Sequence, residues 1–71
     1  MKAIKITGES VELFKVLKFE AIAASGGEAK SIIADGNVTV NGELELRKRR
    51  KLVLGDTFEV FDQQYQLVED G

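Results

Sequence analysis

Cysteine, histidine and proline are absent from this 71-residue chain, and each absence removes a class of structure or chemistry. Without cysteine there can be neither a disulfide framework nor a thiolate metal site. Without histidine, general acid–base catalysis would depend on Asp, Glu, Lys or Tyr, and no carboxylate pair stands in an apolar setting that would shift its pKa. Without proline, glycines and capping side chains must set the helix ends.

Long hydrophobic runs and glycine-rich phosphate loops are also missing. No stretch approaches the roughly 20 apolar residues of a membrane span, and the Walker spacing does not occur. Glu43 with Glu45, or Glu69 with Asp70, could bind a cation weakly, but each pair lacks a third ligand and solvated carboxylates are the simpler interpretation. We therefore expect a non-catalytic, cytoplasmic protein that needs no cofactor or metal and does not bind membranes.

The length of the chain allows one domain, which would span residues 1–71. A domain this small has little room for a deep ligand pocket. Its charge is unevenly distributed, because residues 47–51 carry half of the ten basic side chains. The net charge of −2 therefore divides into +5 in this run and −7 elsewhere. Such asymmetry indicates a polyanionic partner, although an isolated basic run is often only a solvated loop.

Hydrophobic periodicity predicts a strand and then a helix at the start of the chain. Residues 2–6 alternate in the manner of a strand with one face on the core. In residues 9–18 polar side chains recur at every third position, which predicts a helix that is buried over most of its circumference. Residues 19–24 are apolar and rich in alanine, and they would turn the chain between two helices that pack together.

A second helix is predicted from its capping residues. Ser25 and Glu28 match a capping box, in which the serine oxygen accepts from the Glu28 amide and the glutamate reaches back to the serine amide. The helix would begin near Gly26 and end at Gly36, which suits a left-handed cap.

Residues 38–40 predict a strand, and Asn41-Gly42 predicts a tight turn after it. A two-residue loop would place Val40 opposite Glu43 and mix core and solvent residues on one face. A three-residue loop would place Val40 opposite Leu44 and keep the apolar face intact, so we prefer that register.

The rest of the chain predicts further short strands. Lys48 and Arg50 interrupt the alternation of apolar residues, so residues 47–51 should leave the sheet as an exposed loop. A turn at Gly55-Asp56 would follow. Strands are predicted at residues 57–61 and 65–68, with residues 62–64 as their connection. The predicted fold class is α+β, with two helices packed on a small mixed or antiparallel sheet of about four to five short strands.

The predicted core joins both helices to the sheet. Its members are Leu17, Ile32, Ile33, Val40 and Phe58. Tyr65 and the four phenylalanines are also expected inside, because a domain of this size needs its aromatic residues there. Stacking of Phe19 or Tyr65 on a nucleic-acid base is the alternative.

The second helix and the strand after it carry a resemblance to a known family. Ser25, Ala29-Lys30, Ile32-Ile33, Gly36 and the run V-T-V-N-G at residues 38–42 match the helix-strand signature of the S-four domain, the RNA-binding module first named from ribosomal small-subunit protein four. The later Gly55-Asp56 fits the same pattern. The stand-alone YbcJ-like subgroup is most similar, because it has a comparable R-K-R-x-K run where this chain has residues 47–51.

This chain departs from the family pattern at two basic positions. Many S-four domains have Arg-Leu-Asp in the first helix and Ser-Arg at the start of the second, where this sequence has Glu12-Leu13-Phe14 and Ser25-Gly26. Lys30 does match a basic position of the motif. It lies four residues after Gly26, so a phosphate could approach it past the small glycine.

The resemblance implies contact with structured RNA, such as ribosomal or transfer RNA, by a monomeric domain. The side chains to which it assigns that contact are Lys30, Arg47, Lys48, Arg49 and Lys51, with Arg50, Lys15 and Lys18 as further candidates. Plain solvent-facing positions that pair with Glu12 are the alternative for Lys15 and Lys18. A different function is also open, in which the basic loop docks an acidic partner within a ribonucleoprotein assembly.

Overall fold

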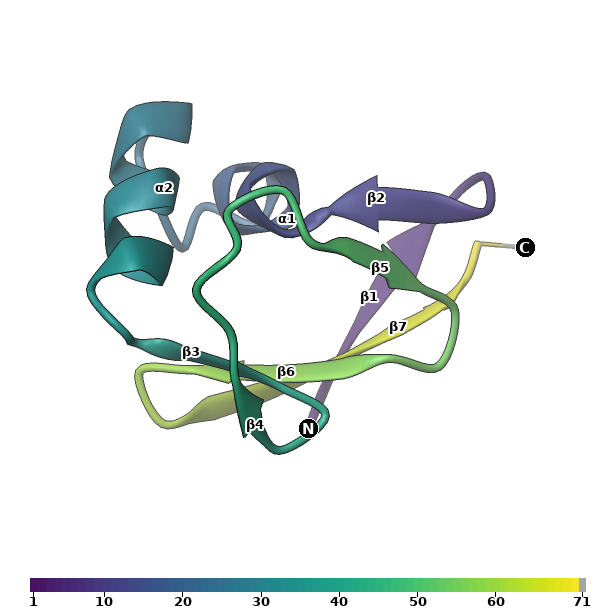
Figure 1. Ribbon diagram of the computed structural model, residues 1–71. Coiled ribbons are helices and arrows are strands. Elements are labelled where there is room, and N and C mark those ends of the chain that lie inside the picture. The colour runs from purple at the N-terminus through teal and green to yellow at the C-terminus, as the bar shows by residue number, and fades with distance from the viewer. Residues whose placement is uncertain (71) are drawn as a thin grey trace.

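A five-stranded mixed sheet carries two helices on one face in the computed structural model, which describes residues 1–70 (Figure 1). In chain order the elements are β1 (Lys2–Ile6), β2 (Ser10–Glu12), α1 (Leu13–Phe19), α2 (Gly26–Ala34), β3 (Val38–Val40), β4 (Glu43–Leu44), β5 (Lys51–Val53), β6 (Thr57–Val60) and β7 (Gln63–Glu69). The strand order is β1-β7-β6-β3-β4. Strand β1 runs parallel to β7, and the other neighbours are antiparallel. The predicted fold class is confirmed.

Strands β2 and β5 form a separate two-stranded sheet, and this corrects the predicted first helix. The prediction began that helix at Glu9, but Ser10–Glu12 is a strand and α1 begins only at Leu13. Val11 pairs with Leu52, which lies about forty residues later in the chain. A partner so distant leaves no trace in local periodicity, so the pattern of polar residues alone predicted a longer helix.

Helix α2 begins at the predicted serine cap. The hydroxyl of Ser25 accepts a hydrogen bond from the Glu28 amide at 3.1 Å. The Glu28 carboxylate accepts from the Ala24 amide at 3.2 Å, whereas the sequence predicted the Ser25 amide as this donor. Gly36 follows the helix with a φ of +84°, as its predicted left-handed role requires. Neither α1 nor α2 is long and apolar enough to cross a membrane.

The turn between β3 and β4 is a two-residue loop, so the preferred three-residue register is wrong. Val40 lies opposite Glu43, and Asn41 and Gly42 both have positive φ, at +51° and +85°. The strand register therefore points Leu44 outward, 60% exposed, while Glu45 turns inward and is only 5% exposed. The apolar alternation gave the wrong register because the buried carboxylate of Glu45 is paired with Arg47 and Arg50.

The last two strands also differ from their predicted limits. Residues 61 and 62 form the turn between β6 and β7, with φ values of +50° and +65°. Gln63 and Gln64, predicted as part of the connection, belong to β7 and pair with β6. Because the turn has only two residues, β7 starts at Gln63. Its first residues pair with β6, and the residues from Tyr65 onward pair with β1.

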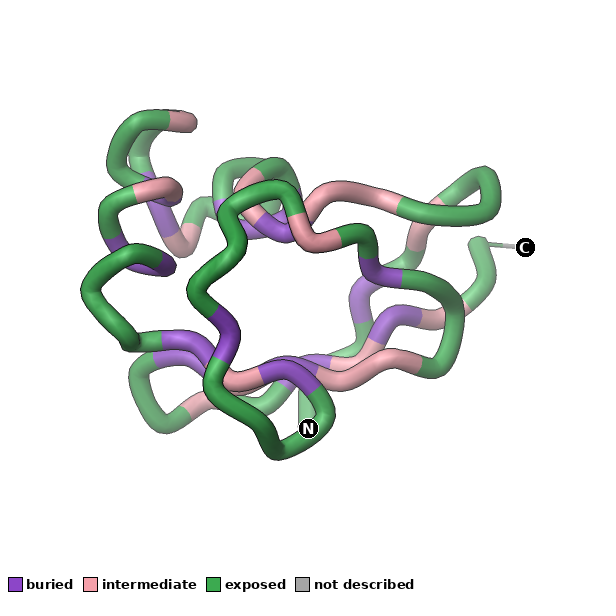
Figure 2. Tube along the Cα trace, in the orientation of Figure 1, coloured by how far each residue is buried: buried purple, intermediate pink, exposed green. Residues whose placement is uncertain are grey.

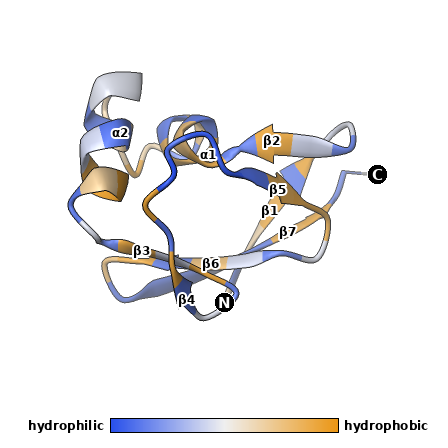
Figure 3. Ribbon diagram, in the orientation of Figure 1, coloured by the Kyte–Doolittle hydropathy of each residue, from blue (hydrophilic) through white to orange (hydrophobic). Residues whose placement is uncertain are grey.

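The core lies between the sheet and the two helices, where the buried segments of Figure 2 face one another. All five predicted members are buried, and so is Tyr65, whose ring stacks on Phe58 with centroids 4.9 Å apart. Figure 3 shows apolar residues in α1, α2, β3 and β6, and the buried ones among them belong to the core. Phe19 and Phe61 are exceptions to the prediction that all aromatics are buried, because they are 68% and 61% exposed.

Candidate nucleic-acid interface

Residues 45–51 form a raised connection between the main sheet and β5, here called the basic arch (Figure 1). Its first end is fixed to the sheet, because the amide of Glu45 donates to the carbonyl of Val38 at 3.0 Å. Its far side is fixed to α1: the amide of Leu13 donates to the carbonyl of Arg50 at 2.8 Å, and the amide of Phe14 donates to that of Lys48 at 3.1 Å. The arch thus accepts hydrogen bonds from amides that helix formation leaves free at the start of α1.

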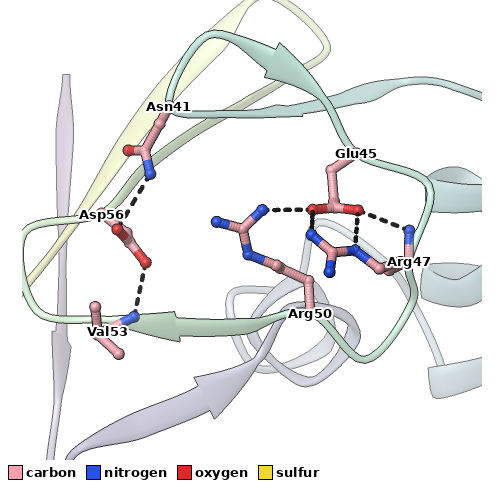
Figure 4. Close-up of polar contacts among 6 residues, drawn as sticks. All are labelled: Asn41, Glu45, Arg47, Arg50, Val53 and Asp56. Atoms are coloured by element: carbon pink, nitrogen blue, oxygen red, sulfur yellow. Dashed lines mark hydrogen bonds and ion pairs between the residues drawn. The ribbon is translucent and has the colours of Figure 1, made fainter.

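Under the arch, one carboxylate holds two of its arginines (Figure 4). Arg47 donates from Nε and Nη2 to the two oxygens of Glu45, at 3.0 and 3.1 Å, and its backbone amide donates as well at 3.0 Å. Arg50 donates from Nη1 to the same carboxylate at 2.6 Å. The fork of Arg47 on Glu45 is bidentate, which is the strongest and most directional form of such a pair.

The acidity of Glu45 reflects these contacts. The pKa of Glu45 is lowered to about 2, mainly by hydrogen bonds from the Arg47 side chain, while burial acts in the opposite direction. The backbone amide of Arg47 and the side chain of Arg50 also contribute to this lowering. In return, the carboxylate raises the pKa of Arg47. Glu45 and Arg47 therefore remain charged at neutral pH.

The other basic residues of the arch have exposed side chains. Lys48 and Lys51 take part in no ion pair with any of residues 1–70, and Arg49 is 4.0 Å from Glu12 with its side chain 73% exposed. At such exposure an ion pair is weak, so a phosphate could compete for Arg49. The predicted exposed loop is confirmed for Lys48 and Arg49, whereas Arg50 is only 30% exposed. Lys51 is exposed but is not in the loop, because it begins β5 and pairs with Glu12.

Phe14 connects the arch with the second helix. Its amide binds the arch, and the ammonium of Lys30 lies over its ring, 4.8 Å from the centroid. A Cβ built on Gly26 would lie 3.8 Å from the same ring. The predicted path for a phosphate past Gly26 is therefore bounded by Phe14. The aromatic ring instead places Lys30 on the side of α2 that faces α1.

The two lysines of α1 differ in their surroundings. Lys15 forms an ion pair with Glu12 at 3.1 Å, as the alternative interpretation of this residue predicted, and it also approaches the Phe14 ring. Lys18 is exposed in the last turn of α1, where its positive charge interacts favourably with the helix dipole. None of the hydrogen bonds or ion pairs among residues 1–70 ties Lys18 to the arch.

Side chains join the turn at Asn41-Gly42 to the turn at Gly55-Asp56. The Asn41 amide donates to the Asp56 carboxylate at 3.1 Å (Figure 4). The side-chain oxygen of Asn41 also accepts from the Thr57 amide at 3.0 Å. Asp56 also accepts from the amide of Val53 at 2.8 Å. Asn41 is thus more than a turn residue, because through Asp56 it connects the turn after β3 with the last residue of β5.

Sequence reasoning missed Glu45 and Phe14. Glu45 was weighed only as a weak cation ligand, yet its carboxylate is occupied by two arginines. Among residues 1–70, no group of three or more His, Cys, Asp or Glu side chains could hold a metal ion. The sequence did contain one indication of this pairing. With a two-residue turn before β4, the alternation places the Glu45 side chain toward the core, and arginines follow it at the second and fifth positions. Nothing in the sequence indicated that Phe14 would contact both the arch and Lys30.

The family model of the S4 domain, the S-four domain of the resemblance above, matches residues 4–68. The chain belongs to the S4 domain family. The match includes the arch, both helices and the two turns joined by Asn41. This match confirms the resemblance to the S-four domain that the sequence indicated.

Individual relatives agree with this assignment. The chain is 45% identical over 58 residues to the putative RNA-binding protein YbcJ of Escherichia coli, covering 82% of this chain and 83% of YbcJ. It is 39% identical over 57 residues to the probable ribosome maturation protein RlbA of Bacillus subtilis, covering 80% of each.

Solved structures support the same fold. The solution structure of YbcJ from E. coli, which has an alfaL motif involved in RNA binding, matches with a TM-score of 0.67 and 39% identity over 94% of this chain and 84% of that one. The 30S ribosomal protein S4e of Thermoplasma acidophilum matches in fold, with a TM-score of 0.70 and 24% identity over 84% of this chain. This chain corresponds to 32% of that longer protein.

Proposed function

We propose that this protein is a non-catalytic module that binds the phosphate backbone of structured RNA, with ribosomal or transfer RNA as its target. The observation that carries the proposal is the basic arch, which concentrates exposed cations on a loop held at both ends. The similarity to a putative RNA-binding protein and to a probable ribosome maturation protein supports this class of target. We expect the domain to act as a monomer in the cytoplasm.

The proposed contacts are electrostatic. Lys48, Arg49 and Lys51 would approach phosphates directly, since their side chains are exposed. Lys30 would extend the same surface from α2, because Phe14 joins that helix to the arch. A loop already fixed by hydrogen bonds loses little conformational freedom on binding. Few neutral polar side chains accompany these charges, so the surface suits recognition of backbone shape more than of base sequence.

The test is a titration of structured RNA at several salt concentrations. In a Lys48→Ala/Lys51→Ala variant, the slope of log K against log salt should become shallower by about 1.4 to 1.8, the equivalent of two phosphates. A Lys2→Ala/Lys5→Ala variant is the matched control, because it removes two exposed lysines from β1 and changes net charge equally. Equal effects of the two variants would refute a localised site.

A second candidate function rests on two exposed leucines. Leu44 and Leu46 flank Glu45 and are 60% and 53% exposed beside the arch. An acidic protein partner with an apolar contact could use both the leucines and the cations. If this is the function, Leu44→Ser/Leu46→Ser should abolish binding to the protein partner. If RNA is the direct ligand instead, the same variant should bind purified RNA with unchanged affinity.

A further inference from the structure

A buried acidic residue inside a surface proposed to attract phosphates is unexpected on electrostatic grounds. Glu45 lies at the foot of the arch, and its negative charge opposes phosphate binding at every nearby position. Two guanidinium groups converge on it in Figure 4. One carboxylate between two arginines leaves this cluster with a net charge of +1, so Glu45 lowers the charge of the arch without abolishing it.

The geometry of Arg47 suggests what the carboxylate contributes. Nε and Nη2 of Arg47 are directed at Glu45, while Nη1 donates to no acceptor among residues 1–70. The Arg47 side chain is nevertheless 72% exposed. A guanidinium is planar and rigid, so fixing one edge on Glu45 also fixes the direction of its remaining N–H groups.

The backbone supports the same arrangement. The amide of Arg47 also donates to Glu45, and the amide of Arg50 donates to the carbonyl of Arg47 at 3.3 Å. The Cα of Arg47 is thus held on both sides while its head is held by the fork. An arginine constrained in this way has already lost much of the rotamer entropy that a free surface arginine loses on binding.

We propose that Glu45 is a positioning residue for RNA binding, which holds Arg47 by one edge so that the remaining N–H groups of Nη1 and Nη2 present pre-oriented donors to a phosphate. Arg50, whose side chain is only 30% exposed, completes the support for the carboxylate and does not itself bind RNA. This inference rests on the proposed function. It means that Glu45, although acidic, strengthens the binding of an RNA phosphate.

The direction in which Glu45→Gln changes RNA affinity distinguishes this positioning role from an effect of charge alone. Glu45→Gln removes a negative charge, so an effect through charge alone would strengthen RNA binding and steepen its salt dependence. Loss of positioning has the opposite effect: we expect affinity to fall by about two- to tenfold, the equivalent of one hydrogen bond. The slope of log K against log salt should become shallower by about 0.7 to 0.9.

Glu43→Gln is the matched control. Glu43 lies two residues earlier, on β4, and is exposed, so its replacement makes the same change in net charge near the arch. It should leave RNA affinity unchanged or raise it slightly. Glu45→Gln binding that matches or exceeds that of Glu43→Gln would overturn the proposal.

Arg47→Lys provides a second test that does not alter the buried carboxylate. Lysine keeps the charge but cannot form the fork and present a second pair of donors, so affinity should fall as it does in Glu45→Gln. In the Arg47→Lys background, Glu45→Gln should then cause little further loss. Unchanged affinity of Arg47→Lys would overturn the positioning role even if Glu45→Gln proves too unstable to measure.

These outcomes differ from failure of the proposed function. If the protein does not bind RNA through the arch, the Lys48→Ala/Lys51→Ala variant keeps wild-type affinity and salt dependence. If only the positioning role is wrong, that variant loses affinity while Glu45→Gln binds as tightly as Glu43→Gln.

Discussion

The side-chain amide of Asn41 lies 3.1 Å from the carboxylate of Asp56 and joins two turns that are fifteen residues apart. One turn connects β3 to β4, shortly before the arch, and the other follows β5, the strand that the arch enters. The contact therefore joins the two chain segments that flank the arch. Its side chains are exposed, but each of them also binds a backbone amide.

Replacing Asn41 by Asp should destabilise the fold while keeping the shape of the side chain and its tolerance of positive φ. The change removes the amide donor and sets two carboxylates against each other, with an expected loss of about 0.5 to 1.5 kcal/mol in the free energy of unfolding. Chemical denaturation measures this loss. The double variant Asn41→Asp/Asp56→Asn restores a donor and an acceptor and should recover part of it; no recovery would argue against the contact.

Shortening the buried isoleucines of α2 should cost much of the stability of so small a domain. Ile32→Ala and Ile33→Ala are each expected to lower the free energy of unfolding by about 2 to 4 kcal/mol, because both side chains are buried against the sheet. Leu46→Ala is the control, since Leu46 is 53% exposed and should cost far less. Unchanged thermal midpoints for both isoleucine variants would contradict the described core.

Acid should remove the contribution of Glu45 to stability. Its pKa is about 2 in the folded protein, compared with 4.5 as its ordinary value. Because the folded pKa is lowered, the contribution is fully present above about pH 4.5 and is lost as the pH falls through about 2. The difference in unfolding free energy between wild type and Glu45→Gln should therefore shrink over this range, as urea titrations at successive pH values would show. A constant difference would mean that the carboxylate is not held by its arginines.

Lys30 should contribute to RNA affinity in a way that Lys18 does not. Lys30→Ala removes a cation that Phe14 links to the arch, so the salt slope should become shallower by about 0.7 to 0.9. Lys18→Ala, on α1, makes the same change in charge and should leave the slope nearly unaltered. Fluorescence anisotropy with one structured RNA compares the two variants directly. A larger effect from Lys18 would move the interface toward the end of α1.

Local chemistry in the sequence was sufficient for most of the segment between residues 25 and 42. The Ser25 cap, the left-handed Gly36 and the Asn41-Gly42 turn are set by interactions over a few residues, and the structure has all three. The core positions Ile32, Ile33 and Val40 follow from periodicity for the same reason. The exposure of Lys48 and Lys51 could also be predicted, because an unpaired ammonium group is costly to bury.

The tertiary structure alone decided the register of β4 and the arrangement of the arch. An inward-facing Glu45 is unfavourable by every local criterion, and only the arrival of Arg47 and Arg50 in three dimensions makes it stable. The strand at residues 10–12 likewise exists because β5 lies beside it. Such partners are selected by the packing of the whole chain, since pairing energies depend on which groups meet and not on how far apart they are in sequence.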